Sequence, residues 1–258
     1  MKIRPALPGE GACIASMIRD SLPPAVEGLT IWHCAGAARY VEQQLRDREG
    51  AQDPLVSAAY WVLDGAAGQP AGMAKLRTAG ESIFLDHIYV AAGARGAARG
   101  RELLRRSVTQ GAAESGSSFL MLDVDPSNEL AFGWYQRLGL AQVGETFWQT
   151  MPLRPVTAER LRVKGWAAAE TQHAELDFSQ FRLGHDDGCF LVGRLGGAYF
   201  RLTQARACTD RRVHYTLHAI DPKRSLLMIT GKKRDHLEVK RRTVRMRAGI
   251  SDLLRRLE

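Results

Sequence analysis

The apolar residues of this chain follow two periodicities, one typical of strands and one typical of helices. Continuous or alternating apolar runs predict strands, and apolar residues three or four positions apart predict helices. Strands are expected in the N-terminal part at 2–6, 55–63, 71–77, 83–90, 118–124, 141–143 and 145–153. Helices are expected there at 8–22, 37–45, 99–113 and 129–138.

One strand–helix–strand unit stands out in this order. Residues 83–90 form a β-branched and aromatic strand, and the helix at 99–113 carries an apolar stripe. The run at 118–124 (SFLMLDV) is almost wholly apolar, as expected of a central strand covered on both faces. A right-handed crossover would make the two strands parallel.

Beyond a linker at 154–156 the pattern becomes weaker. Helices are expected at 157–169, 209–219 and 251–257, and strands at 175–183, 189–195, 198–202 and 225–230. We therefore predict two domains, 1–153 and 154–258, the second a smaller α+β domain. That domain is a candidate for a degenerate second copy of the first.

Charge differs between the two parts. Residues 1–153 carry 14 Lys and Arg against 16 Asp and Glu, whereas residues 154–258 carry 22 against 12. The basic residues are densest between 232 and 247. A solvated charged face explains this run, and the alternative is contact with an acidic partner such as nucleic acid or the ribosome. Aromatic residues are absent from 231 onward, so only phosphate contacts would remain.

Several classes of protein are disfavoured by composition. The first residues show no signal-peptide pattern, and no apolar run is long enough for a membrane span. The four cysteines have no zinc-ligand spacing, and His214 and His218 lack a third ligand, so no metal is expected. These features favour a cytoplasmic protein without membrane contact.

The turn between the strand at 83–90 and the next helix is a candidate binding site. Its sequence, AAGARGAARG, has little side-chain bulk, so backbone amides can approach a ligand. The helix that follows directs its positive end at the turn, which favours an anion such as pyrophosphate. A plain strand-to-helix connection is the alternative.

Two motifs in this order resemble those of the GNAT superfamily of acyl-CoA-dependent N-acetyltransferases. The first is a strand ending in Val followed by Q/R-x-x-G-x-G/A, and it is met here by Val90, Arg95 and Gly100, with Ala98 where the family usually has Gly. The second, N-x-x-A-x-x-x-Y-x-x-x-G, is met in full by Asn128, Ala131, Tyr135 and Gly139. The resemblance covers about residues 1–153.

The resemblance implies a GNAT-like α+β fold, a mixed twisted sheet flanked by helices, with acetyl-CoA as co-substrate. The pantetheine arm would pair with the backbone of Ile88 and Val90, and Asn128 would contact the cofactor. The residues implied for the pyrophosphate are those of the turn and helix start: Arg95, Gly96, Ala97, Ala98, Arg99, Gly100 and Arg101.

The resemblance also assigns chemical roles. Tyr135 would be the general acid that protonates the CoA thiolate, which both motifs together favour over the alternative of a half-buried helix residue. An amine with a pKa of about 10.4 must lose a proton before it attacks. Asp86 and His87 are the local candidates for the base, expected on opposite faces of their strand, with Asp86 on the face of Ile88 and Val90. Asp86 is favoured because acidic residues near this place act as base in parts of the family.

The predicted activity is therefore direct transfer of an acetyl group from acetyl-CoA to a primary amine, on a small molecule or a protein, in a ternary complex. A non-catalytic acyl-CoA sensor is the alternative, in which Ala98 marks loss of function and the basic part docks on a partner. The acceptor and the oligomeric state do not follow from the sequence.

Overall fold

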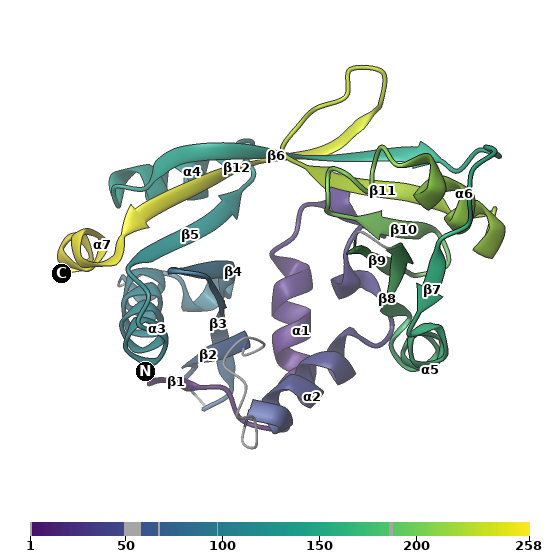
Figure 1. Cartoon of the computed structure of the whole chain (residues 1–258). Coiled ribbons are helices and arrows are strands. Elements are labelled where there is room, and N and C mark those ends of the chain that lie inside the picture. Colours follow the sequence, from purple (N-terminus) through teal and green to yellow (C-terminus); the bar gives the residue numbers. More distant parts are fainter. Residues whose placement is uncertain (1, 49–57, 67, 97, 186–187) are drawn as a thin grey trace. The chain divides into compact units, whose positions relative to one another are not determined.

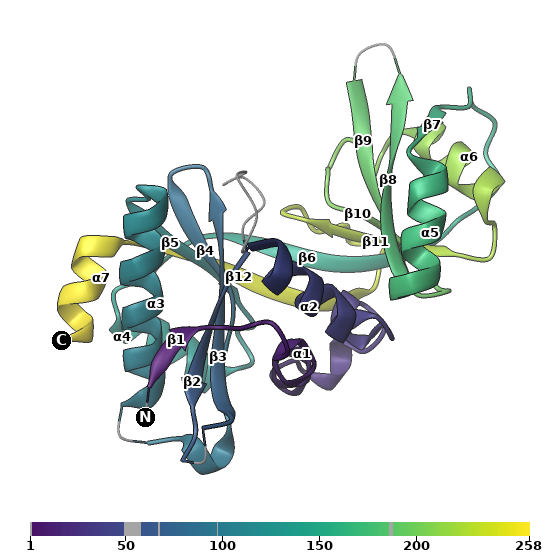
Figure 2. The ribbon, with the colours of Figure 1, turned by 90° about the horizontal axis from the view of Figure 1, so that it is seen from below.

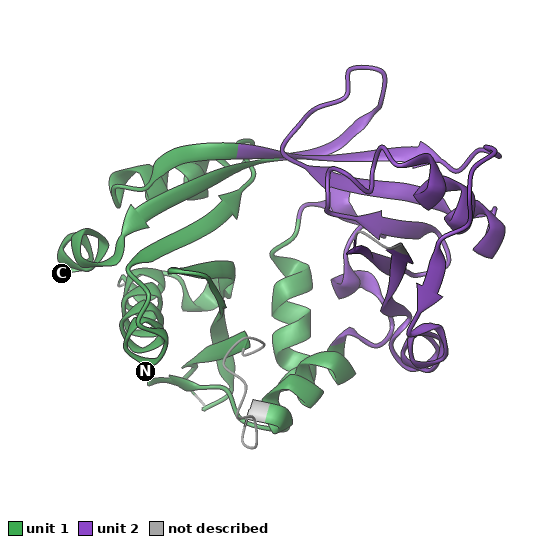
Figure 3. Ribbon diagram, viewed as in Figure 1, with its two compact units in different colours: residues 1–22, 38–144, 243–258 green, residues 23–37, 145–242 purple. Residues whose placement is uncertain are grey.

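A computed structural model describes residues 2–48, 58–66, 68–96, 98–185 and 188–258 (Figure 1). The chain is a mixed α+β protein that divides into two compact units (Figure 3). Unit 1 consists of residues 1–22, 38–144 and 243–258, and unit 2 of residues 23–37 and 145–242. Each unit is described below by itself.

Unit 1 contains most of the elements predicted for the N-terminal part. Its strands are β1 (Ile3–Pro5), β2 (Ala58–Asp64), β3 (Pro70–Ala79), β4 (Ser82–Val90), β5 (Phe119–Val124) and most of β12 (Val239–Gly249). Its helices are α1 (Gly11–Asp20), α2 (Ala37–Arg48), the short η3 (Ala92–Ala94), α3 (Arg99–Ser115), α4 (Glu129–Arg137) and α7 (Ile250–Leu257).

The strands of unit 1 lie in the order β1-β2-β3-β4-β5-β12. Neighbouring strands are antiparallel except β4 and β5, which are parallel and are joined through α3. The predicted strand–helix–strand unit is therefore confirmed. Figure 2 shows α3 and the α1–α2 pair on opposite faces of β2–β4.

One core holds the α3 side of this sheet together. The apolar stripe of α3, which includes Leu103, Leu104 and Val108, is fully buried against it. Strand β12 contributes Val244 and Met246 to the same core, and α7 packs beside α3. Burial of these side chains fixes the position of α3, the helix that carries the predicted anion site at its start.

Unit 2 has its own core and repeats the strand order of unit 1 as β7-β8-β9-β10-β11-β6. Its strands are β6 (Ala141–Pro152), β7 (Arg162–Lys164), β8 (Phe178–His185), β9 (Gly188–Leu195), β10 (Tyr199–Leu202) and β11 (Ser225–Thr230). Its helices are η1 (Pro24–Val26), η2 (Ile31–His33), α5 (Trp166–Leu176) and α6 (Arg211–Ile220).

The pairing in unit 2 repeats that of unit 1 as well. Strands β10 and β11 are parallel and are joined through α6, and the other neighbours are antiparallel. This is the arrangement expected of a second copy of the same fold. That residues 154–258 are a degenerate GNAT copy stays a prediction.

The boundaries of the two compact units differ from the predicted division of the chain after residue 153. The chain passes from unit 1 to unit 2 within β6, and it returns to unit 1 within β12. The assignment of the domains 1–153 and 154–258 stays a prediction about the sequence.

Two predictions about elements are wrong, and one strand was not predicted. Residues 141–153 form the single strand β6 instead of two, because Gly144 does not take a positive φ and the strand continues through it. The helix expected at 157–169 starts only at Trp166, after Gly165 adopts the left-handed conformation with φ +74°. The basic run was not assigned a strand, yet from Val239 onward it is β12.

Ion pairs neutralise much of the basic run. Lys233 pairs with Asp235 at 3.5 Å, Lys240 with Glu238, and Arg242 with Glu145. Such pairs fit a charged but satisfied face better than an open basic patch. Contact of residues 231–247 with nucleic acid stays a prediction. Among the described residues, none of the helices has the length and apolar character that a membrane crossing needs.

Candidate active site

Strand β4 loses its parallel partner halfway along its length. It pairs with β5 only from Ser82 to Leu85, whereas its pairing with β3 continues to Val90. The backbone groups from Asp86 to Val90 that face β5 are therefore not used in the parallel pairing. An extended ligand that carries amides can pair with such an edge. This is where the cofactor arm was predicted to bind beside Ile88 and Val90.

A β-bulge lies at the point of separation. Leu76 of β3 faces Leu85, and the adjacent Lys75 faces His87, so Asp86 is the extra residue on β4. A bulge changes which face the following side chains occupy, and bulges are frequent beside active sites.

The bulge corrects one prediction about Asp86. Ile88 and Val90 pack against the same core as Ile83 and Leu85, although strict alternation would place the two pairs on opposite faces. Asp86 instead contacts side chains outside this core. It therefore does not share a face with Ile88 and Val90, because the extra residue shifts the alternation by one.

Two cations hold the Asp86 carboxylate. Arg77 Nε donates to Oδ1 at 2.8 Å, and Lys75 Nζ lies 3.4 Å from Oδ2. Lys75 is only 8% exposed, and this burial lowers its pKa while Asp86 opposes the change. Each carboxylate oxygen therefore already contacts a cation, which limits its freedom to accept a proton from a substrate.

A cation–ring contact followed by two hydrogen bonds leads from this pair toward α2. Lys75 Nζ lies 5.6 Å from the Tyr60 ring centroid, and the Tyr60 hydroxyl donates to Gln44 Oε1 at 2.6 Å. Gln44 Nε2 in turn donates to the Tyr40 oxygen at 3.2 Å. Burial raises the pKa of both tyrosines. The sequence prediction missed Lys75, Arg77 and Gln44, and the signal was present: Lys75 and Arg77 alternate with apolar residues along a predicted strand.

The turn before α3 is fixed by its own arginines. Arg95 Nε donates to the carbonyl of Val90 at 3.0 Å, and Arg99 Nη1 donates to the carbonyl of Ala94 at 2.8 Å. A Cβ placed on Gly93 or Gly96 would meet no atom within 4 Å, so the backbone of the turn is open on those sides. The turn can therefore admit a ligand next to its backbone. Ala97, predicted to be part of this site, lies outside the described residues.

Ala98 adopts the left-handed conformation that favours glycine. Its φ is +55° and it is the residue that precedes the first turn of α3. Gly96 also has a positive φ, +92°. The two positions together bend the chain so that α3 starts beside β4, where a Cβ on Gly100 would lie 3.9 Å from Val90 Cγ2. Ala98 permits this geometry at an energetic cost that Gly would avoid.

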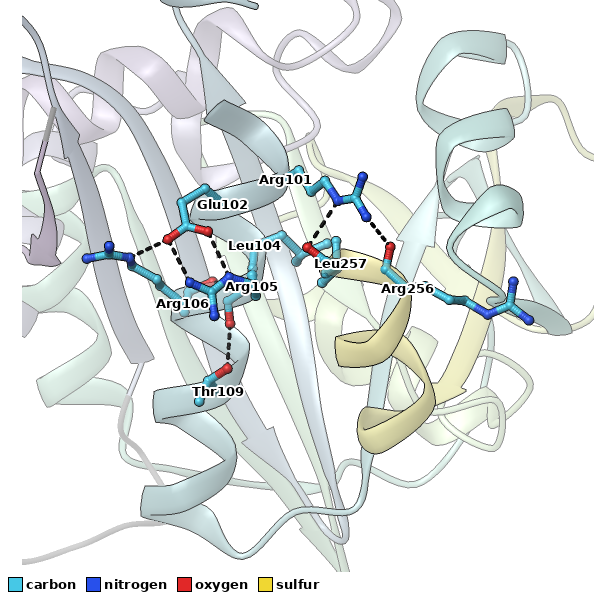
Figure 4. Close-up of polar contacts among 9 residues, drawn as sticks. Arg101, Glu102, Leu104, Arg105, Arg106, Thr109, Arg256 and Leu257 are labelled. Carbon is cyan, nitrogen blue, oxygen red and sulfur yellow. Dashed lines mark hydrogen bonds and ion pairs between the residues drawn. The ribbon is translucent and has the colours of Figure 1, made fainter. Parts of the chain in front are cut away.

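The side chains in the first turn of α3 have structural partners (Figure 4). Arg101 donates from Nε to the carbonyl of Leu257 at 3.1 Å and from Nη2 to the carbonyl of Arg256, so it caps the end of α7. Glu102 accepts from Arg105 and Arg106, and these bonds lower its pKa to about 2. At Arg101, only the backbone remains for the predicted pyrophosphate contact.

Tyr135 is buried in the core of unit 1. It is 6% exposed, and its ring centroid lies 5.1 Å from that of Trp134. Burial raises the pKa of its hydroxyl, which therefore stays protonated at neutral pH. No described residue hydrogen-bonds to this hydroxyl. It shares its core with Ile88 and Val90, so the candidate acid and the free part of β4 belong to one cluster.

Asn128 has a local structural role. It is the N-cap of α4, and its Oδ1 accepts from the backbone N–H of Ala131 at 3.2 Å. Its amide nitrogen has no such bond to a described residue, so a cofactor contact would use that group. Among the described residues, no cluster of three His, Cys, Asp or Glu side chains could hold a metal ion.

Comparison with known proteins identifies this arrangement. Residues 29–140 match the model of the acetyltransferase (GNAT) family. The tandem GNAT protein from the clavulanic acid biosynthesis pathway is 14% identical, with 96% of this chain and 98% of that chain covered and a TM-score of 0.61. A GCN5-related N-acetyltransferase from Sphaerobacter thermophilus is also 14% identical, with 96% and 95% covered and a TM-score of 0.57.

At these identities the two solved structures show similarity of fold. No curated protein matches the sequence. The family model covers the strand and turn of the first motif and the whole helix of the second. The chain therefore contains an acetyltransferase domain of the GNAT family, at residues 29–140.

Proposed function

We propose that unit 1 transfers an acetyl group directly from acetyl-CoA to a primary amine while both are bound. The observation that carries this proposal is the free end of β4, which lies between the turn of α3 and the core that holds Tyr135. A family of acyl-CoA-dependent acyltransferases provides the reaction class. The transferred group and the acceptor are the proposed parts.

The residues present fit the co-substrate. The backbone amides of Ala98, Gly100 and Arg101 lie at the positive end of α3, which would stabilise the charge of a pyrophosphate, whereas the Arg99 N–H already donates to the Gly96 carbonyl. The backbone of Ile88 and Val90 would pair with the amides of the pantetheine arm, and the Asn128 amide nitrogen would donate to it. When bound, acetyl-CoA supplies a thioester carbonyl open to attack by an amine.

The chemistry that follows needs three groups of the protein. As the amine nitrogen attacks the thioester carbon, a backbone N–H of β4 would stabilise the oxyanion. A base removes the amine proton, and collapse of the intermediate breaks the C–S bond. The Tyr135 hydroxyl would give its proton to the sulfur as this bond breaks.

Asp86 is our candidate for the base. Each of its oxygens contacts one cation, so the amine proton would go to a remaining lone pair, directly or through a water, or would follow movement of Arg77 or Lys75 away from the carboxylate. Arg77 is the more mobile partner, since its side chain is 46% exposed and that of Lys75 only 10%. Arrival of the acceptor would therefore displace Arg77 first.

The test follows release of free thiol from acetyl-CoA in the presence of a panel of amines. Tyr135→Phe should lower kcat by about 100-fold or more with little change in KM, because the hydroxyl acts only as the C–S bond breaks. The free energy of unfolding should change by less than about 0.5 kcal/mol, since no described residue hydrogen-bonds to this hydroxyl.

Two results would contradict the proposal. If Tyr135→Phe equals the wild type on every active amine, Tyr135 is not the acid. If CoA binds but no amine is acetylated, a binding function without catalysis replaces the enzyme.

A further inference from the structure

We propose that the acceptor carries an anionic group, a carboxylate, several bonds away from its amine, and that Arg247 binds this group. The proposal rests on the proposed function, because it concerns the acceptor of that reaction. Its evidence is a row of charged residues on the face of the unit 1 sheet opposite the α3 core.

The row follows from strand register. Arg77 of β3 faces Phe84 of β4, Phe84 faces Met121 of β5, and Met121 faces Arg247 of β12. Directly opposed residues direct their side chains to the same face of a sheet. The alternate residues of β12, such as Met246, belong to the core on the other face. The two arginines therefore lie at the two ends of one row across four strands.

The row continues into the candidate catalytic residues. The next position of β4 on this face is Asp86. The next position of β5 is Asp123, and it faces Arg245 of β12. Among the described residues of β3, β4, β5 and β12 named here, the cations are Lys75, Arg77, Arg245 and Arg247, and the carboxylates are Asp86 and Asp123. These six side chains carry an excess of positive charge close to the separated end of β4.

Arg247 is the cation of this face that lacks a carboxylate partner among the described residues. Asp86 forms ion pairs with both Lys75 and Arg77, and Asp123 accepts two hydrogen bonds of 2.8 Å from Arg245. Neither carboxylate forms an ion pair with Arg247, and the Arg247 Nε is buried without a hydrogen-bond partner. The residue as a whole is half-buried, so a carboxylate would bind the terminal Nη groups and partly offset the desolvation of the cation.

The Arg247 guanidinium is already held in a defined position. Its Cζ lies 3.6 Å from the ring centroid of Phe119, so the group stacks on the aromatic face. Stacking restrains the side chain and leaves the edge of its planar fork for a two-bond contact with a carboxylate. Arg77 and Arg245 flank Phe84 in a similar way, with Cζ at 4.2 and 5.5 Å from the ring centroid.

The register also limits the length of the acceptor. Parallel pairing ends at Leu85, one residue beyond the row of Arg247, and the acetyl group is expected next to the free segment that begins at Asp86. Two to three strand residues correspond to about 7–10 Å along the strands, and β12 lies two strands away from β4, which adds about 10 Å across the sheet. The amine and carboxylate of an α-amino acid share one carbon and cannot span this distance. A longer ω-amino carboxylate, or a short peptide with a free carboxyl end, can.

The experiment compares ω-amino carboxylates of rising chain length, from glycine to aminohexanoate, with their neutral primary amides. For the longer members, the wild type should show a kcat/KM about 10- to 100-fold higher for the carboxylate than for the amide. Arg247→Gln should reduce the ratio of kcat/KM for carboxylate and amide to about one. Arg247→Lys, which keeps the charge but not the fork, should restore part of the preference.

Arg255→Gln is the matched control. It removes one positive charge from unit 1 at an exposed position on α7 that pairs with Asp252, so the preference should persist. If carboxylate and amide react equally in the wild type, or if Arg247→Gln keeps the preference while folded by its circular dichroism, the assignment is wrong.

A binding measurement separates this result from failure of the proposed reaction. Calorimetric titration of aminohexanoate and its amide into the protein saturated with CoA does not depend on turnover. Stronger binding of the carboxylate that is lost in Arg247→Gln supports the site even if no amine is acetylated. Equal binding of the two compounds overturns it.

Discussion

At the scale of single residues, the site is shaped by two irregular positions. Asp86 is the extra residue of a bulge, and Ala98 is a left-handed alanine before α3. Neither irregularity has a signature in the sequence, because a bulge depends on the partner strand and an alanine does not signal positive φ. The motif comparison did mark Ala98, since the family usually has Gly there. The structure shows why Gly is suited to the position.

Ala98→Gly should stabilise the protein. Relief of the left-handed conformation is worth about 1 kcal/mol in the free energy of unfolding, measured by urea denaturation. Ala113→Gly is the control, because Ala113 lies exposed within α3, where the same change should destabilise by about 1 kcal/mol. Equal effects of the two substitutions would show that Ala98 is not strained.

At the scale of elements, α3 and β12 hold the sheet of unit 1 together. Helix α3 connects the two parallel strands and starts at the open turn, and β12 closes the sheet beside β5. The sequence was sufficient to predict α3, because its apolar stripe is regular. It was not sufficient for β12, although Val244, Met246 and Ala248 alternate with charged residues there, because the many Lys and Arg obscured the pattern.

Only the parts of the candidate site that are formed by consecutive residues could be predicted from the sequence. Local features, such as the strand 83–90, the glycine- and alanine-rich turn and the Asn-capped helix, were predicted in place. Features that depend on pairing between strands were not: the cations at Lys75 and Arg77 that engage Asp86, and the arginines of β12. The first depend on the bulge between the consecutive strands β3 and β4, and the second on pairing of β12 with β5, which is far away in the chain.

Met246→Ala tests the role of β12. Met246 is fully buried in the unit 1 core, so truncation should destabilise by about 2–5 kcal/mol. Thermal unfolding followed by circular dichroism would measure the change. Lys240→Ala, at a partly exposed position of the same strand, should alter stability by less than about 0.5 kcal/mol. A small effect at Met246 would mean that β12 is dispensable.

Glu102 should give α3 a measurable acid sensitivity. Its pKa is lowered from 4.5 to about 2 by Arg105 and Arg106 when the protein is folded. Its contribution is therefore complete above about pH 4.5 and is lost as the pH falls toward 2. The side chain is 36% exposed, so this contribution stays below about 1 kcal/mol.

The measurement is the difference in Tm between wild type and Glu102→Gln as a function of pH. The difference should be constant near neutral pH and should shrink as the pH falls from 4.5 toward 2. Glu159→Gln, at an exposed position outside the helices, should show no such trend. A difference that grows on acidification would contradict the assigned pKa.

At the scale of the whole molecule, the two compact units are not continuous segments. Unit 1 needs residues 243–258, which follow all of unit 2 in the chain. A fragment of residues 1–153 would lack β12 and α7 and would expose the edge of β5. We expect it to aggregate or to remain unfolded, whereas residues 2–144 joined by a short flexible linker to 243–258 should fold. Circular dichroism and gel filtration of the two fragments decide between these outcomes.

The late position of β12 also has a consequence during synthesis on the ribosome. Arg245 pairs with Asp123, which is made 122 residues earlier. At translation rates of about 5–20 residues per second, β5 emerges roughly 6–24 s before the strand that covers its edge. Throughout that interval, the uncovered edge of β5 in the nascent chain must not pair with strands of other chains. Cellular yield should therefore depend on translation speed and chaperone supply more strongly than the stability of the finished protein would indicate.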